Sequence, residues 1–485
     1  MKNIKLIMLI FIAAGAVGCN KFLEEKPQGI LIGDVAISNV NGLNAQLAGA
    51  YSTLIGSWGS GFATAAAIGS SMGGDDVTTH PASNKADFRE FDQFNVNSFN
   101  GRSSAIWNGC YKSIQSANNI INNYAKATGD ENDIMRIVGE AHFIRAFSYY
   151  YLVRWWGKIP LITTAVYSPD LLNVPKSEIT EVYKLIEEDL KKAEELVGDQ
   201  KLAPGRINKG VVKAYLADMY LTQSGWPLKD NSKVALAAQY AKDVIDNKAK
   251  YGFDLFQGDF LKIFAGGTSE NVFALMTDGN ATSNLYYGWS GMPGDENGWD
   301  DYCSEINFFN SFPEGNRKNG TFLTSVTKSD GTVVQWQNFS IKHPYYKKFR
   351  IQIGNPNTYY SSNPIIFMRY AEVLLIYAEA QARSGAPNAD AYAAVNAVRN
   401  RAGLGDLATG MNSANFVNAV LQERAWEFAA EWHRWFDLVR TETVKQANSN
   451  RHANEIPLIG DPGDQTKWFL PIPASEVTSN PSLGK

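Results

Sequence analysis

Four large aromatic side chains lie close together in a segment that is otherwise rich in Gly, Ser and Asn. They are Tyr286, Tyr287, Trp289 and Trp299. The segment lacks the periodic apolar residues of a core helix, so its rings are candidates for exposure at the surface. An exposed ring stacks on the apolar C–H face of a pyranose, while neighbouring polar side chains bind the sugar hydroxyls. Packing under a long loop is the alternative for each ring.

A second group with similar chemistry stands earlier in the chain. Trp58, Asp75 and Asp76 lie in an irregular stretch that runs from residue 57 to residue 100. Long irregular segments in a compact protein usually carry function. We therefore treat both groups as candidate ligand-binding residues, and we predict that the two tryptophans of the first group form part of a platform for a glycan.

Three glutamates recur at a spacing of four residues, which puts Glu423, Glu427 and Glu431 on one face of a helix. Paired carboxylates can act as acid and nucleophile in glycoside hydrolysis. Arginines share the same predicted helical segment or a neighbouring one, namely Arg369, Arg424, Arg434 and Arg440. With so many cations nearby, we favour buried ion pairs that lock helices together over a catalytic pair.

Other catalytic patterns are weak. Gly69-Ser-Ser-Met-Gly73 matches the nucleophile pattern of α/β hydrolases, which needs a strand before it and a helix after it. The following residues, Gly74-Asp-Asp76 and His80-Pro81, are typical of turns instead. The five histidines are scattered and lack the paired spacing of a transition-metal site. We predict no serine hydrolase and no transition-metal centre.

One loop holds four acidic residues, Asp295, Glu296, Asp300 and Asp301. Oxygen ligands at such spacing could hold a calcium ion, although the residue order of an EF-hand is absent. A solvated polar loop is the favoured interpretation, and calcium is the alternative. No other cofactor is expected.

The first residues read as an export signal. Two lysines, an apolar run from Leu6 to Phe11 and small residues up to Gly18 form a secretory signal whose apolar run is too short to span a membrane. Cys19 follows directly. We therefore predict cleavage before Cys19 and acylation of its thiol, which would anchor the mature protein in a membrane. A chance cysteine at the cleavage point is the alternative.

Charge and cysteine content exclude some classes of protein. The formal net charge is −4, and loss of the two leader lysines lowers it to −6. Binding to nucleic acid needs a basic stripe, so we expect no nucleic-acid partner. Besides Cys19, only Cys110 and Cys303 occur, and two buried thiols are favoured over a disulfide between them.

Helical periodicity positions these residues. Apolar residues at helical spacing predict helices over most of 34–250 and 365–441, whereas 251–364 is loop-rich, with a short strand at 271–276. Paired helices at 212–245 and 370–401 resemble degenerate tetratricopeptide repeats, which stack because a pair cannot bury its apolar face alone. We predict a mostly α fold: a helical-repeat scaffold with an irregular, loop-rich insertion that carries short strands.

The chain resembles the SusD/RagB family of nutrient-binding outer-membrane lipoproteins. The matching segments, in chain order, are Cys19, Glu140-Ala-His-Phe-Ile-Arg-Ala-Phe147, Gly157-Lys-Ile-Pro160, Arg369-Tyr-Ala-Glu-Val-Leu-Leu-Ile-Tyr-Ala-Glu-Ala380, Val395-Asn-Ala-Val-Arg-Asn-Arg-Ala-Gly403, Gln422-Glu-Arg-Ala-Trp-Glu-Phe428, Glu431-Trp-His-Arg-Trp-Phe-Asp-Leu-Val-Arg-Thr441, Leu470-Pro-Ile-Pro473 and Asn480-Pro481. Each segment alone is a weak signal, but together and in this order they are specific.

The resemblance implies a function. Such proteins sit on the cell surface, bind an oligosaccharide or for some relatives a peptide, and pass it to a TonB-dependent, SusC-like β-barrel transporter without catalysis. We accordingly expect a signal peptide at 1–18, a lipidated tether at 19–33 and one domain at 34–485 with an extended tail at 442–485. A peptide-binding relative, a surface-anchored glycosidase and a pure protein–protein scaffold are the competing readings.

Overall fold

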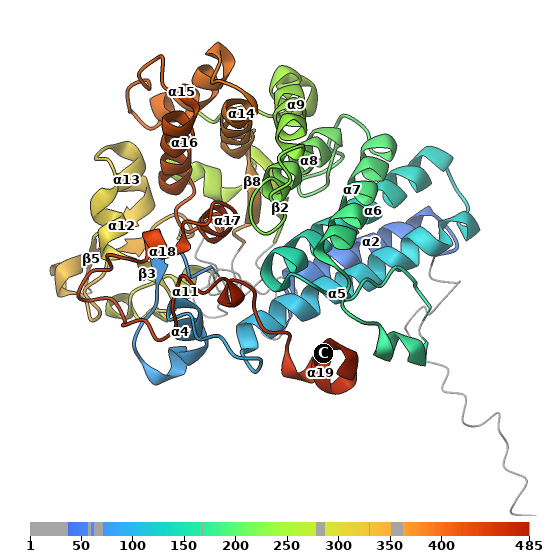
Figure 1. Ribbon diagram of the computed structural model, residues 1–485, viewed down its shortest axis with the longest axis horizontal. Coiled ribbons are helices and arrows are strands. Elements are labelled where there is room, and N and C mark those ends of the chain that lie inside the picture. The colour runs from blue at the N-terminus through green and yellow to red at the C-terminus, as the bar shows by residue number, and fades with distance from the viewer. Residues whose placement is uncertain are drawn as a thin grey trace, which may run out of the picture.

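The computed structural model describes residues 37–56, 60–62, 71–166, 168–277, 287–328, 330–350 and 362–484. Seventeen α-helices dominate this part of the chain, and its strands are only two to five residues long (Figure 1). The predicted mostly helical fold is therefore confirmed. The export signal, Cys19 and the tether lie outside the described residues, and no helix within them is long and apolar enough to cross a membrane.

Two groups of antiparallel helices form the scaffold. In the N-terminal group, neighbours in sequence pack together: α2 (Val40–Ile55) on α5 (Gly101–Asn123), α5 on α6 (Glu131–Trp156), α6 on α7 (Ile179–Leu196), and α8 (Lys209–Gln223) on α9 (Lys233–Asp246). In the C-terminal group, α14 (Tyr370–Ser384) packs on α15 (Ala389–Arg401) and α16 (Ser413–Glu427), and α14 also contacts α9, which joins the two groups. Figure 1 shows the N-terminal group on the right and the C-terminal group at the upper left.

Short elements complete the chain within, between and after these groups. They are the helices α4 (Ala86–Asp92), α10 (Lys248–Tyr251), α11 (Tyr287–Ser290), α12 (Ile306–Ser311), α13 (Asn316–Thr321), α17 (Arg434–Arg440), α18 (Val444–Ala447) and α19 (Ala474–Ser479), and the strands β1 (Val77–Thr78), β2 (Asn271–Leu275), β3 (Cys303–Ser304), β4 (Phe322–Leu323), β5 (Ser325–Thr327), β6 (Val333–Gln335), β7 (Tyr345–Tyr346) and β8 (Ile365–Arg369). The loop-rich insertion with short strands thus stands where the sequence predicts it.

Helix α7 illustrates how the sequence determines local structure. Glu178 and Glu181 form a capping box at its start, which satisfies backbone N–H groups that have no partner within the helix. Val182, Ile186 and other apolar residues four positions apart are buried on one face. On the exposed face Lys191 binds Glu187 at 2.7 Å.

Aromatic rings fill the core between α6 and the central strand pair. Strand β2 pairs antiparallel with β8, which confirms the strand predicted at 271–276. The ring of Phe367 on β8 meets the rings of Phe147 and Tyr151 on α6 edge to face, at centroid distances of 5.0 and 5.4 Å. These geometries suit the quadrupoles of aromatic rings and add to the free energy of burial. Cys110 and Cys303 are both buried free thiols.

A network of buried ion pairs surrounds Arg369 at the end of β8. Arg369 is 1% exposed; its Nε lies 2.7 Å from Glu431 and its Nη1 2.8 Å from Glu427. Arg317 binds Glu423 and Glu427 at 2.6 and 3.0 Å. Further members are Glu270, Lys348, Arg399 and Arg401. The three regularly spaced glutamates are therefore structural, as the sequence favours. The prediction that all three lie on one face of a helix is wrong, because α16 ends at Glu427 and Glu431 lies in the turn after it.

We predict that Glu427→Gln destabilises the protein by about 3–5 kcal/mol, because the loss of one buried carboxylate leaves Arg369, Arg401 and Arg317 with too little negative charge. Urea unfolding followed by far-ultraviolet circular dichroism measures the free energy of unfolding. The matched control, Glu188→Gln, changes an exposed glutamate on α7 and should leave that free energy unchanged.

The pH dependence provides a second readout for Glu427. Burial raises the pKa of this carboxyl, but the cations Arg401, Arg369, Arg317 and Lys348 outweigh burial and hold the pKa well below its usual 4.5. Its contribution to stability is thus present above pH 4.5 and is lost as the pH falls through the folded-state pKa. The difference in the free energy of unfolding between the wild type and Glu427→Gln should therefore shrink in acid. A difference that is constant between pH 7 and pH 3 would contradict stabilisation by the charge of Glu427.

Candidate functional site

Short strands bring the two loop regions selected from the sequence side by side. Strand β1 pairs antiparallel with β3, so that Val77 faces Ser304 and Thr78 faces Cys303. The backbone N–H of Glu305 also donates to the carbonyl oxygen of Asp76 at 3.2 Å. Residues near 75 and residues near 300 therefore lie side by side, although 227 positions (304 − 77) separate Val77 from Ser304 in the sequence.

The aromatic hairpin, defined as residues 289–301, brings Trp289 and Trp299 together. The N–H of Trp299 donates to the carbonyl oxygen of Trp289 at 2.9 Å, and the N–H of Asp301 donates to that of Ser290 at 2.8 Å. Trp289 and Trp299 are both half-buried residues, so neither belongs fully to the core. A Cβ atom at Gly298 would lie 2.2 Å from the Cβ of Met292, so the return of the hairpin requires glycine there.

Polar contacts fix the hairpin to its surroundings. Asp301 forms an ion pair with Lys85, and its side chain accepts a hydrogen bond from Ser290 Oγ at 2.7 Å. The carbonyl oxygen of Asp301 accepts a hydrogen bond from Thr79 Oγ1 at 2.7 Å. Asp300 accepts a hydrogen bond from Tyr345 at 2.5 Å. These contacts therefore fix the aromatic hairpin to the neighbouring segments of the chain.

The contacts of the four loop acids bear on the hypothesis that this loop binds a calcium ion. Asp295 accepts a hydrogen bond from the Ser340 N–H at 3.0 Å, and Glu296 pairs with Arg350 at 2.6 Å. Each of the four loop acids thus has a protein partner. Across the described ranges, no group of three or more His, Cys, Asp or Glu side chains is arranged to hold a metal ion.

A groove of about 440 Å³ borders the aromatic hairpin. Three chain segments line it, namely residues 78–81, 340–343 and 454–457. Two lining residues, Thr79 and Ser340, hydrogen-bond to Asp301 and Asp295 of the hairpin, so the hairpin and the groove are direct neighbours. This volume lies within the range of about 300–1,000 Å³ that is usual for ligand pockets.

The groove offers polar side chains that the sequence alone did not single out. His80 accepts a hydrogen bond from the Ala82 N–H at 2.8 Å, and burial lowers its pKa, so the imidazole is neutral at pH 7. Lys342 is exposed, and Asn454 is an adjacent neutral donor and acceptor. The sequence did not indicate His80 as a ligand-binding residue, because its His-Pro pair is typical of a turn. It did not indicate Lys342 and Asn454 either, because nothing in their spacing shows that they meet.

A buried charged cluster supports the groove from beneath. Arg451 binds Asp92 at 2.7 Å and Glu305 at 2.9 Å, and His343 lies 3.3 Å from Glu455. Burial raises the pKa of Asp92 to about 6 despite the opposing charge of Arg451. These contacts tie α4, the start of α12 and the C-terminal tail together and so fix the walls of the groove.

The remaining candidate residues either face away from the aromatic hairpin or lie outside the described residues. The Asp75 carboxylate accepts two hydrogen bonds from the Arg434 guanidinium, at 2.6 and 2.8 Å. Asp76 is 3% exposed, and its carboxylate accepts a hydrogen bond from the Ala430 N–H at 3.0 Å. Both carboxylates thus face the C-terminal helices and not the aromatic hairpin. Trp58, Tyr286 and the side chain of Tyr287 lie outside the described residues.

The serine pattern lacks the geometry of a hydrolase. Residues 71–73 form a turn, and a bend at residues 74–76 leads into β1 instead of a helix. A nucleophile elbow needs a helix directly after its serine. The described residues after Ser71 therefore do not have the geometry of a nucleophile elbow.

Comparisons with known proteins agree with the geometry. Residues 325–485 match the model of the SusD family, and residues 21–221 match a model described as "Starch-binding associating with outer membrane". The chain belongs to the SusD/RagB-like family. The family resemblance read from the sequence is thus confirmed, from the tetratricopeptide-like helices to the C-terminal tail.

Individual family members are distant in sequence but similar in fold. SusD-like protein P2 of Formosa agariphila is 29% identical over 100% of this chain and 99% of its own. A SusD-like protein of Bacteroides ovatus is 25% identical over 73% of this chain and 68% of its own. Among solved structures, a SusD superfamily protein of Parabacteroides distasonis has a TM-score of 0.79 at 24% identity and covers 91% of this chain and 98% of its own. A laminarin-binding SusD-like protein has a TM-score of 0.77 at 23% identity, with the same two coverages.

Asp76 yields a prediction of pH dependence. Burial raises its pKa from 3.8 to about 6, although the Ala430 N–H and Arg434 favour the charged form. Because the folded-state pKa is the higher one, keeping the buried carboxylate ionised costs free energy, and that cost develops as the pH rises from about 4 to about 6. Asp76→Asn keeps an oxygen acceptor for Ala430 and should become more stable relative to the wild type over this range, by up to about 3 kcal/mol.

Urea unfolding of Asp76→Asn and the wild type at pH 4, 5, 6 and 7 measures this difference. Asp461→Asn, at an exposed position, serves as the control and should show a constant difference from the wild type. The burial argument for Asp76 fails if the Asp76→Asn difference is also independent of pH.

Proposed function

We propose that this protein binds an oligosaccharide on the face formed by the aromatic hairpin and its groove. The observation that carries the proposal is the pairing of Trp289 with Trp299 beside a groove of about 440 Å³ lined by polar side chains. Half-buried indoles provide faces for pyranose rings, and His80 and Asn454 provide hydrogen bonds for hydroxyl groups. Family relatives support this class of ligand: one solved structure is a laminarin-binding SusD-like protein, and another contains a xylogluco-oligosaccharide.

The proposal extends to location and partner. Acylated at Cys19, the protein would be held at the outer membrane, exposed at the cell surface, and would pass its ligand to a TonB-dependent, SusC-like β-barrel transporter. The description of the matching family, which names association with the outer membrane, supports this location. We propose capture without catalysis, because Glu423, Glu427 and Glu431 are engaged in buried ion pairs and have no access to a substrate.

The double variant Trp289→Ala/Trp299→Ala tests the aromatic platform. Loss of two stacking faces should weaken binding about ten- to hundredfold, measured by isothermal titration with an oligosaccharide first selected on a glycan array. Trp426→Ala, which removes a half-buried indole on α16, is the matched control and should leave the affinity unchanged. Thermal unfolding of both variants checks the fold. Wild-type affinity in the folded double variant would refute the platform.

The variant Cys19→Ala tests the role of the lipid anchor. Since Cys19 is not among the residues proposed to contact the oligosaccharide, the purified variant should bind it as the wild type does. Cells that carry only this variant should fail to take the oligosaccharide up, because the protein is no longer held at its transporter. Uptake of radiolabelled ligand measures this, and normal uptake by the variant would show that the anchor is dispensable.

A further inference from the structure

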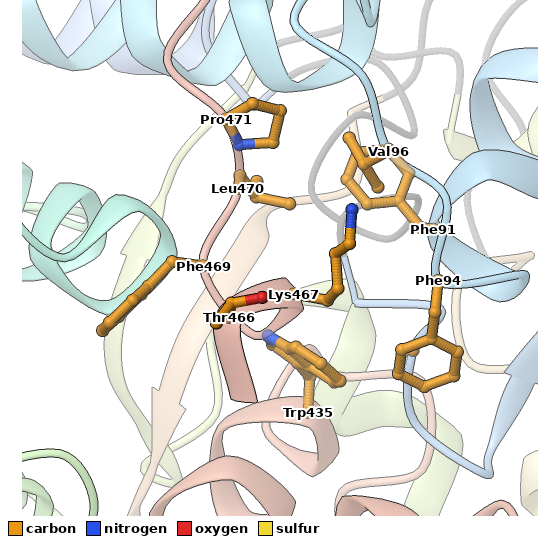
Figure 2. Close-up of a pocket in the computed structure, with 10 residues that line it drawn as sticks. Phe91, Phe94, Val96, Trp435, Thr466, Lys467, Phe469, Leu470 and Pro471 are labelled. Atoms are coloured by element: carbon orange, nitrogen blue, oxygen red, sulfur yellow. The ribbon is translucent and has the colours of Figure 1, made fainter. Parts of the chain in front are cut away.

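A second cavity, of about 260 Å³, lies between α4 and the C-terminal tail. Figure 2 shows Phe91, Phe94 and Val96 on one side, and Leu470 and Pro471 on the other. Trp435 lies at the lower end of this space, and Lys467 projects between the two sides. The volume is below the range usual for drug-sized ligands, so the cavity suits one ring-sized or branched apolar group.

The aromatic wall of this cavity is built at a conformational cost. Phe94 has a φ of 55°, in the left-handed region that non-glycine residues rarely adopt, and its ring contacts that of Trp435 at a centroid distance of 6.1 Å. On the other side of Trp435, a Cβ atom at Gly73 would lie 2.6 Å from the indole ring, so only glycine permits this approach. Strain of this kind persists where surrounding contacts over-determine it, often at ligand sites.

Two side-chain donors that line this cavity have no hydrogen-bond partner among the described residues. Trp435 Nε1 and Lys467 Nζ form no hydrogen bond to the described part of the chain, and no carboxylate there lies within ion-pair distance of Lys467. By contrast, the Pro471 carbonyl oxygen already accepts a hydrogen bond from Trp156 Nε1 at 3.1 Å, and the Gly73 carbonyl oxygen accepts one from Asn448 at 3.2 Å. A complementary ligand therefore joins an apolar body to an anionic acceptor.

The rim of the cavity extends the apolar surface. Phe99 is 84% exposed and follows Val96 of the cavity wall by three residues. Its loop is firmly held: the Phe99 N–H donates to Asn97 at 2.8 Å, and the Ala474 N–H donates to the Ser98 carbonyl oxygen at 2.8 Å. Ile459 is 64% exposed, and its N–H donates to Gln93, the neighbour of Phe94 in sequence. Exposed apolar side chains on a rigid rim mark a surface for a protein partner.

We propose that this cavity binds the C-terminus of a partner polypeptide that ends in an apolar residue. The last side chain fills the space above Trp435, the terminal carboxylate pairs with Lys467 and accepts a hydrogen bond from Trp435 Nε1, and the preceding residues cover Phe99 and Ile459. A C-terminal residue is the chain position that carries a carboxylate directly beside an apolar side chain, and its capture is a known mode of peptide recognition. This site is separate from the aromatic hairpin and its groove.

Fluorescence anisotropy with labelled hexapeptides tests the proposal on the full chain. One peptide ends in Phe with a free carboxylate, and its partner has the same sequence and a C-terminal amide. The free acid should bind about tenfold more tightly, since a charge-assisted hydrogen bond is lost in the amide. Lys467→Met should remove this preference, whereas Lys445→Met, at an exposed lysine nearby, should keep it. Val96→Trp should fill the cavity and abolish binding of both peptides, with thermal unfolding as the check on its fold.

Several outcomes would overturn the proposal. Equal binding of acid and amide, or an acid preference that survives Lys467→Met, excludes recognition of the carboxylate. Equal binding of an amidated peptide with an internal aspartate excludes a C-terminus. Saturable binding of free glucuronic acid that Lys467→Met abolishes, without binding of any peptide, assigns the cavity to an acidic sugar instead. No saturable binding of any probe refutes the site. Because Trp289→Ala/Trp299→Ala should leave peptide binding unchanged, failure here is distinguishable from failure of the glycan site.

Discussion

The burial of charge around Arg369 is the constraint on which the rest of the molecule depends. A guanidinium that is 1% exposed has no water to solvate it, so its position is tolerable only when carboxylates surround it. Those carboxylates come from distant parts of the chain: Glu270 precedes β2, while Glu427 and Glu431 lie at and beyond the end of α16. The strand pair, the C-terminal helices and the loop-rich insertion must therefore all be in place before the charge of Arg369 is neutralised.

This constraint extends to the candidate ligand-binding face through a short chain of contacts. Between α16 and α17 the backbone turns sharply, and Ala430 has a φ of 58° next to the ion-paired Glu431. The N–H of Ala430 donates to Asp76, which directly precedes β1, and β1 pairs with β3 at the base of the aromatic hairpin. Asp75, bound to Arg434, adds a second connection of the same kind. The two aspartates that the sequence nominated for ligand binding thus hold the binding face in position.

How far the sequence predicts this structure depends on the range of each interaction. The stripe of Val182 and Ile186 on α7 follows from spacing within one helix and is confirmed. The ion pairing of Glu427 is also confirmed, but its partner Arg369 comes from another element, which helical spacing does not predict. The role of Asp76 depends on Ala430, more than three hundred positions away, and the groove joins residues near 80, 342 and 455. Side-chain type gives no register for such long-range pairing. The pairing of Trp289 with Trp299 lies between these cases, because one hairpin brings them together.

The groove and the cavity beside Trp435 share a wall, and this wall explains how two sites can coexist. Phe91 and Phe94 line the cavity, whereas Asp92 lies beneath the groove, where Arg451 binds its carboxylate. The tail follows the same wall, from Pro457 in the groove to Gly460, whose N–H donates to Gln93. A wall held by a buried ion pair and backbone hydrogen bonds keeps both spaces formed without ligand. Neither of the two proposed ligands would then have to order the chain first, so the affinity at each proposed site would depend on its own contacts.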